Sequence, residues 1–337
     1  MTSTIINPSN AGISGLGLWL DAAYSPSITS IPSSWSDRSG LGCNATGSGT
    51  LTGVTMSNIN GVPAIYIPQN SGYYDWTANT PTSTTTGYTM FFVGTQTPIN
   101  TQVRVFTTTG GTQVYSDPWT VWVNFANPPG SITATSPYIF SCSVGSTFQF
   151  WNNGTSNGSP ANTNAYSSSS VMIANNAYNG ANSAYQYYGL IGEVIVYNSG
   201  MLSTSNRQII EGYLAWKWGA QSNLAAGHPY YTAAPVFVGT PTNLILITSG
   251  GSATLSWTAA AGATGYSWNL YQSSSNNYVG TSFATGTTLG ATTASATGLT
   301  LGLYYYFTVI ATATGGSSPA AASAIDHLQN HTSKCSV

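Results

Sequence analysis

The stretch that decides the fold is NRQIIEGYLAWKWGAQSNLAAGHPYY, residues 206–231. Apolar side chains spaced for one face of a helix occupy its first half: Ile209, Ile210, Tyr213, Leu214 and Trp216. Ser203 or Ser205 can cap the start of this helix, and Gly219 stands where a helix commonly ends. The rest of the chain is written for β-structure, so we expect one helix near the end of a β-domain.

Strand-like segments recur from residue 13 to residue 200. They are rich in β-branched and aromatic residues and are separated by clusters of Gly, Asn, Pro and Ser. Examples are Tyr88–Val93, Trp119–Val123, Tyr138–Cys142 and Leu190–Tyr197. Many short strands with turn-rich joints predict an all-β fold, a sandwich or jelly roll with one C-terminal helix.

A second β-domain follows a short linker that contains Pro235 and Pro241. Its sequence predicts seven short strands in about ninety residues, which is typical of an Ig-like sandwich. We therefore expect a first domain over residues 1–233, a second over residues 234–326 and a flexible tail over residues 327–337.

The composition departs from that of an average domain. Charged residues make up 4% of the chain, against about a quarter in average domains. Apolar residues make up 42%, so the chain is not of the disordered class, which combines low hydrophobicity with high charge. A surface of Ser, Thr, Asn and Gly repels copies of itself weakly. It suits a protein packed into an oligomeric assembly or, equally, a secreted β-protein.

Several partner classes are disfavoured. Arg207 and Lys217, the closest two of the five basic residues, are ten positions apart, so no cluster is available for nucleic-acid phosphates. No apolar run approaches the roughly 20 residues of a membrane span, and the first residues lack a secretory signal. Three cysteines, Cys43, Cys142 and Cys335, fit neither a disulfide framework nor a zinc site, although Cys335 could link two chains.

The second domain resembles a fibronectin type III module. Trp257 stands where that family keeps its core tryptophan, and LTLGLYYYFTVIA, residues 299–311, matches the family's Leu-x-x-Gly-x-x-Tyr-x-Phe-x-Val-x-Ala pattern. The resemblance implies that Tyr305 forms the tyrosine corner. It also implies a spacer or adhesion module.

The first domain is similar to concanavalin A-like, laminin-G-like jelly rolls over about residues 12–231. The likeness rests on WSDRSGLGCNA (35–45), NGVPAI (60–65) and GEVIVYN (192–198). The closing EGYLAWKWG (211–219), with the His-Pro-Tyr that follows, resembles proteins of large DNA viruses of algae and protists, of phages and of marine bacteria. This resemblance implies a virion surface or minor capsid protein.

An enzyme is not expected. Glycoside hydrolysis needs two carboxyl groups about 5–9 Å apart, and glucanases of this fold carry a Glu-x-Asp-x-x-Glu run that the chain lacks. Its two glutamates, Glu193 and Glu211, belong to a strand motif and to the helix. A remote pair such as Asp75 and Asp117 stays open. His228, at the helix exit, is predicted to be a packing residue.

Two kinds of ligand site are predicted. Aromatic and amide side chains for a lectin-like site are Tyr73, Tyr74, Trp76, Tyr115, Trp119 and Asn153. The alternative is that the tryptophans are core residues. One structural calcium could use hard oxygen ligands from Asp37, Asp75 and Asp117, although Asp37 also reads as a turn-forming residue. No other cofactor is expected.

The leading hypothesis for function is a structural or attachment protein on a virus particle, a minor capsid or surface protein. Its partners would be other capsid proteins or host surface glycans. The alternative is a secreted or cell-surface carbohydrate-binding protein of a microbe, which would place it outside the cell.

Overall fold

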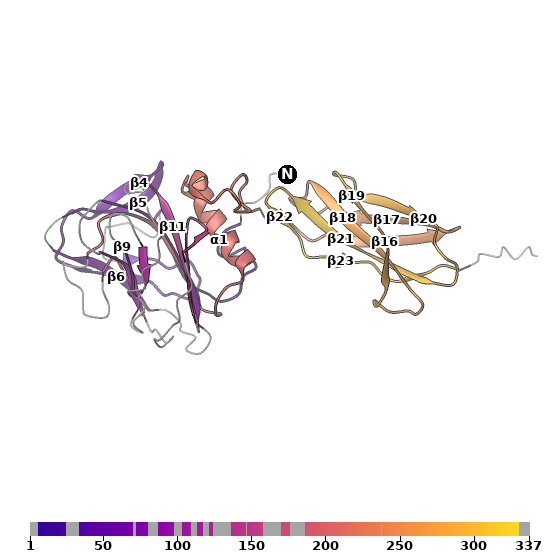
Figure 1. The fold of residues 1–337 in the computed structure, drawn as a ribbon, viewed down its shortest axis with the longest axis horizontal. Coiled ribbons are helices and arrows are strands. Elements are labelled where there is room, and N and C mark those ends of the chain that lie inside the picture. The colour runs from indigo at the N-terminus through magenta and orange to yellow at the C-terminus, as the bar shows by residue number, and fades with distance from the viewer. Residues whose placement is uncertain are drawn as a thin grey trace, which may run out of the picture. The chain divides into compact units, whose positions relative to one another are not determined.

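The chain forms two compact units in the computed structural model, one of residues 7–234 and one of residues 1–6 with 235–337. The structure describes residues 6–24, 34–69, 72–79, 87–97, 103–108, 113–116, 121–123, 136–145, 147–157, 170–175, 186–236 and 238–329. Strands dominate both units (Figure 1), which confirms the all-β sandwich class. The N–H of Ile6 donates to the Pro235 carbonyl at 2.9 Å, so this N-terminal residue joins the second unit.

The first unit contains two antiparallel sheets. One, the helix-covered sheet, has the order β13 (Thr155–Ser156), β12 (Phe148–Asn152), β11 (Tyr138–Val144), β7 (Tyr88–Gln96), β15 (Gly189–Tyr197), β5 (Val62–Ile67) and β4 (Thr55–Ile59), with β1 (Leu16–Asp21) also paired to β15. The other, the opposite sheet, has the order β10 (Val121–Val123), β9 (Gln113–Ser116), β8 (Val103–Thr108), β14 (Ser170–Ile173), β6 (Tyr74–Asn79), β3 (Ala45–Gly49) and β2 (Ser34–Trp35).

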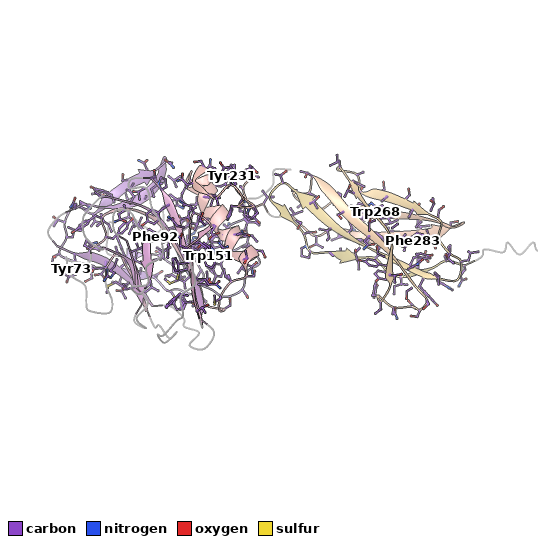
Figure 2. The ribbon with its side chains drawn as sticks, viewed as in Figure 1. Tyr73, Phe92, Trp151, Tyr231, Trp268 and Phe283 are labelled. Atoms are coloured by element: carbon purple, nitrogen blue, oxygen red, sulfur yellow. The ribbon has the colours of Figure 1, made fainter. Side chains whose placement is uncertain are left out.

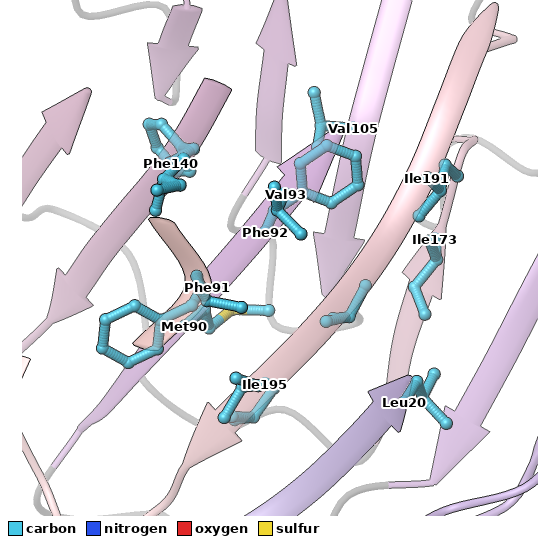
Figure 3. Close-up of a cluster of buried hydrophobic side chains, with 14 of the residues drawn as sticks. Leu20, Met90, Phe91, Phe92, Val93, Val105, Phe140, Ile173, Ile191 and Ile195 are labelled. Carbon is cyan, nitrogen blue, oxygen red and sulfur yellow. The ribbon is translucent and has the colours of Figure 1, made fainter. Parts of the chain in front are cut away.

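Strand β7 is buried along its whole length. Alternate side chains of a strand point to opposite faces of the sheet. Phe92 is in register with Phe140 and Val194 on one face, while Phe91 is in register with Ser141, whose hydroxyl contacts the helix. Figure 3 shows Met90, Phe91, Phe92 and Val93 within one apolar cluster. The strand therefore lies between the sandwich core and the helix.

The predicted helix is present as α1 (Thr204–Lys217). The Ser203 side chain accepts the N–H of Asn206 at 3.3 Å and caps its start. After the C-cap residue Trp218, Gly219 takes a φ of +64°, a left-handed value that favours glycine. A short 3-10 turn, η3 (Gln221–Asn223), follows. No helix among the described residues is long and apolar enough to span a membrane.

The second unit also pairs its strands into two sheets. One has the order β16 (Thr242–Ser249), β17 (Ser252–Thr258) and β20 (Thr293–Thr297). The other has β19 (Thr281–Thr288), β18 (Gly265–Ser273) and β21 (Tyr304–Ala313), and along β21 run β22 (Gly316–Ser317), β23 (Ala321–Ala322) and β24 (Asp326–His327). The Tyr305 hydroxyl accepts the N–H of Thr300 at 2.8 Å, as a tyrosine corner would.

The flexible tail was predicted to start at residue 327, but residues 327 and 328 belong to the folded second unit. His327 pairs with Tyr304 in the sheet, and Leu328 is 1% exposed in the core of the second unit. Burial of the Leu328 side chain removes apolar surface from water and holds this segment on the domain. The described part of the unit extends to residue 329.

Candidate functional site

The predicted aromatic cluster, residues 73–76, does not lie on one face, because alternate side chains of β6 (Tyr74–Asn79) point to opposite faces of the sheet. Trp76 is 1% exposed and meets the Trp35 ring edge-on at 5.7 Å between centroids. Tyr74 is also buried and lies 5.0 Å from Trp76. A ring that stacks on a sugar needs a free face, so Tyr74 and Trp76 are corrected from sugar-binding to core residues.

The other residues of this segment have the opposite parity and lie on the outer face of the sheet. Thr77 is in register with Thr46, and Asp75 with Ser48. Thr46 and Ser48 are exposed, while Tyr73 and Thr77 are half-buried. Figure 2 shows Tyr73 at the margin of the first unit. We call Tyr73, Asp75 and Thr77, with Thr46 and Ser48, the outer strip.

Asp75 is a buried acidic residue within the outer strip. Its burial raises the pKa of the carboxyl to about 6, an effect that a hydrogen bond with Thr77 partly offsets. Asp21, Glu193 and Glu211 have cationic partners. Asp75 has no cationic partner among the described side chains, and it is 2% exposed.

Asp37 organises a turn. Its Oδ1 accepts the N–H groups of Trp19 and Ser39, both at 2.9 Å. Its Oδ2 accepts the Ser39 hydroxyl at 2.6 Å and the N–H of Cys43 at 3.0 Å. These donors use both carboxylate oxygens, as expected for a turn-forming aspartate.

The calcium site stays a prediction. The described residues contain no group of three or more His, Cys, Asp or Glu side chains placed to hold a metal ion. Asp117, the third expected ligand, lies outside the described residues, and so does Trp119. Tyr115 belongs to β9, but its side chain is outside the description as well.

Asn153 serves the hairpin between β12 and β13. Its φ is +48°, in the left-handed region that asparagine tolerates better than most residues. The side-chain oxygen accepts the N–H of Ile139 at 2.8 Å, and the carbonyl oxygen accepts the N–H of Ala225 at 3.2 Å. The side-chain oxygen and the main-chain carbonyl of Asn153 are therefore engaged within the fold.

A buried charge network joins α1 to the sheet beneath it. Glu193 on β15 is fully buried, and four donors surround its carboxylate. They are Trp19 Nε1 at 2.5 Å, Tyr213 Oη at 2.9 Å, Lys217 Nζ at 2.7 Å and Trp218 Nε1 at 2.9 Å. Lys217 also contacts Asp21 at 2.6 Å. Desolvation raises the pKa of Glu193, and the Lys217 charge opposes this.

Glu211 forms a second buried network, near the start of α1. Arg207 Nη1 donates to both carboxylate oxygens at 2.5 Å, and the guanidinium stacks 3.9 Å from the centroid of the Trp151 ring. Ser141 donates to the same carboxylate, and His228 Nε2 lies 3.2 Å from it. Ser141 and His228 thus contact different oxygens of the same buried carboxylate.

Both glutamates are therefore used within the fold. Each lies in a buried network between a strand and α1, and each has 0% exposure. Sequence reasoning assigned them to structural motifs but did not pair them with their partners, which are up to 174 positions away in the chain. Of the carboxyl pair left open by the sequence, Asp75 is described and Asp117 is not.

No family model matches the chain, and no curated protein matches its sequence. Among solved structures, a sialidase of Trypanosoma rangeli in complex with 2,3-difluorosialic acid is similar at 13% identity and a TM-score of 0.44, covering 61% of this chain and 34% of its own. The chain thus spans about a third of that sialidase.

Two further structures are similar to parts of the chain. Domain 4 of AbnA, a GH43 extracellular arabinanase from Geobacillus stearothermophilus, in complex with arabinotriose, shows 14% identity and a TM-score of 0.41, covering 57% of this chain and 96% of its own. The FN5 domain of Drosophila Lar shows 17% identity and a TM-score of 0.24, covering 28% and 99%. At these identities the likeness is one of β-fold class, and the virion role stays a prediction.

Proposed function

We propose that this protein is a non-catalytic carbohydrate-binding protein and that the outer strip of the first unit contacts the ligand. The observation that carries the proposal is the setting of Asp75. Its carboxylate has no cationic partner among the described residues and lies beside a tyrosine and three hydroxyl side chains. All five lie on the side of the opposite sheet away from Tyr74 and Trp76, where Thr46 and Ser48 are exposed and Asp75 is 2% exposed.

These groups match the chemistry of a sugar. A carboxylate accepts hydrogen bonds from sugar hydroxyls, and such charge-assisted bonds are roughly twice as strong as neutral ones. The hydroxyls of Thr46, Ser48 and Thr77 can donate and accept. The ring of Tyr73 offers an apolar face for the C–H side of a sugar.

Binding fits the described carboxylates better than hydrolysis does. A glycosidase needs a second carboxyl across the scissile bond. Glu193 and Glu211 are fully buried and bonded, and Asp37 holds its turn. The one carboxylate of the outer strip, that of Asp75, supports recognition of hydroxyl groups without an acid–base pair.

The test is a glycan-array screen of the full chain, run with calcium and again with chelator. Tyr73→Ala and Asp75→Asn are compared with Tyr66→Ala, a matched change of a tyrosine that is 36% exposed on β5 of the other sheet. We expect selective binding that falls at least about tenfold in the first two variants, since a hydrogen bond to a charged group contributes about 1.5–3 kcal/mol.

Three outcomes would count against the proposal: no binding under either condition, equal binding by all variants, or release of sugar products. Loss of binding with chelator would indicate a metal ion near the outer strip and would support the calcium prediction.

The finer assignment is that the strip acts at the surface of a virus particle, against host glycans or neighbouring capsid proteins. It rests on the resemblance of residues 211–219. Mass spectrometry of purified particles tests it, whereas the alternative, a secreted microbial protein, predicts recovery from the culture medium.

A further inference from the structure

The second unit has almost no charge. Among described residues 238–329, Asp326 is the single Asp, Glu, Lys or Arg, where an average domain of this length carries about a quarter charged residues. Charged side chains at sheet edges are a main device by which β-proteins prevent edge-to-edge pairing. This unit must therefore protect its edges by other means or leave them open.

One edge of the unit is paired with short strands, and one residue of another edge strand is held by a side chain. The N–H of Thr248 on the edge strand β16 donates to Asp326 Oδ2 at 3.0 Å, and the Thr248 hydroxyl donates to the same oxygen at 2.8 Å. The outer side of β21 is paired with β22, β23 and β24 in turn. The one described charge of the unit thus occupies the N–H of Thr248 and interrupts the edge of β16, which otherwise pairs with β17 alone.

Strand β19 forms an open edge. It has eight residues, Thr281–Thr288, and pairs with β18 alone. It contains neither proline nor a charged residue. The pairing register with β18 shifts between Ser282 and Ala284, but pairing is continuous from Ala284 to Thr288. The other free edge strand, β20, has five residues and offers a shorter template.

An apolar side chain marks the end of the same strand. Leu289 directly follows β19 and is 96% exposed, which costs solvation free energy that burial in an interface would recover. The side chains of Thr285 and Thr287 are exposed beside it.

We propose that β19 pairs antiparallel with β19 of a second copy of this chain, which joins the two sheets across a two-fold axis. A two-fold contact is self-complementary, so the two strands match in length and neither brings a like charge against the other. Main-chain hydrogen bonds supply the contact, and the two Leu289 side chains lose exposure at its ends.

The first test is sedimentation velocity on the full chain from about 1 to about 100 μM. We expect reversible dimers. Thr285→Lys sets two ammonium groups close together at the two-fold axis and should raise the dissociation constant at least tenfold. Thr254→Lys is the matched control, because it places the same charge on an exposed position of β17 in the other sheet and should leave dimerisation unchanged.

A second measurement needs no variant. Hydrogen exchange of the wild-type chain should show amides of residues 281–288 gaining protection as the concentration rises across the same range. A chain that stays monomeric to about 100 μM, dimers that tolerate Thr285→Lys, or protection confined to other segments would each overturn the proposal. The glycan-array result is independent of all three, because it depends on the first unit.

Discussion

Asp75 shows how one residue links fold and proposed function. Its carboxyl has a pKa of about 6 in the folded chain, against about 3.9 in an unfolded one. Between these values the folded state binds more protons than the unfolded state. The stabilisation that this group contributes is therefore full below about pH 4 and is lost as the pH rises through about 6.

The substitution Asp75→Asn removes this dependence. We expect the variant and the wild type to have similar melting temperatures for the first unit near pH 4, with the variant more stable above pH 6. A gain of about 1 kcal/mol would raise the melting temperature of a unit of this size by about 2–4 °C. Thermal melts from pH 4 to 7 measure it. A constant difference across that range would show that the carboxylate is not the cause.

The neighbouring residues show what sequence could not resolve at this scale. The residue types at Tyr73, Tyr74, Asp75 and Trp76 predicted an aromatic site, and a strand must send alternate members to opposite faces. Which parity lies inside depends on the register with β3 and β14, and β14 is about a hundred positions downstream. That register is long-range information that local spacing does not contain.

At the scale of elements, α1 is the part that the sequence predicted best, including its start near Ser203 and the Gly219 stop. The apolar face and the caps are local features. The choice of sheet face is not local, because it follows from the contacts of Glu193 and Glu211 with strands and aromatic side chains remote in sequence.

The buried charge network at Glu193 makes a measurable contribution to the stability of the first unit. Glu193→Ala leaves the indole N–H groups of Trp19 and Trp218 without an acceptor while Lys217 keeps its contact with Asp21, and each buried donor left unpaired costs about 1–3 kcal/mol. Chemical denaturation of the first unit should show a loss of that size. Glu193→Gln retains an acceptor and should lose less. Equal stability of the alanine variant and the wild type would show that the network at Glu193 does not stabilise the first unit.

At the scale of the whole molecule, two units with separate cores predict two unfolding transitions. The fibronectin-like pattern was informative because residues 299–311 form one short segment, in which Tyr305 has a local partner, Thr300. The extent of the second unit was harder to predict, since Leu328 reaches the core from a polar, tail-like sequence.

Tyr305→Phe tests the separation of the units. It leaves the N–H of Thr300 without its protein acceptor, and because Thr300 is exposed and water can replace that acceptor, we expect a loss of about 0.5–1.5 kcal/mol. Calorimetry should show the transition of the second unit moving to lower temperature while that of the first stays in place. For Glu193→Ala we expect the transition of the first unit to move to lower temperature while that of the second stays in place. A single transition that both changes shift would mean that the units unfold together.

The scarcity of charged residues in the second unit also determines where proteases can cleave the chain. No lysine or arginine lies between Lys217 and Lys334, so trypsin can release residues 218–334 only as one fragment, whether that region is folded or not. A persistent tryptic band of residues 218–334 would report the absence of cleavage sites and say nothing of stability. Chymotrypsin, which cuts beside the tyrosines concentrated in β21, is the protease whose rate will follow its unfolding.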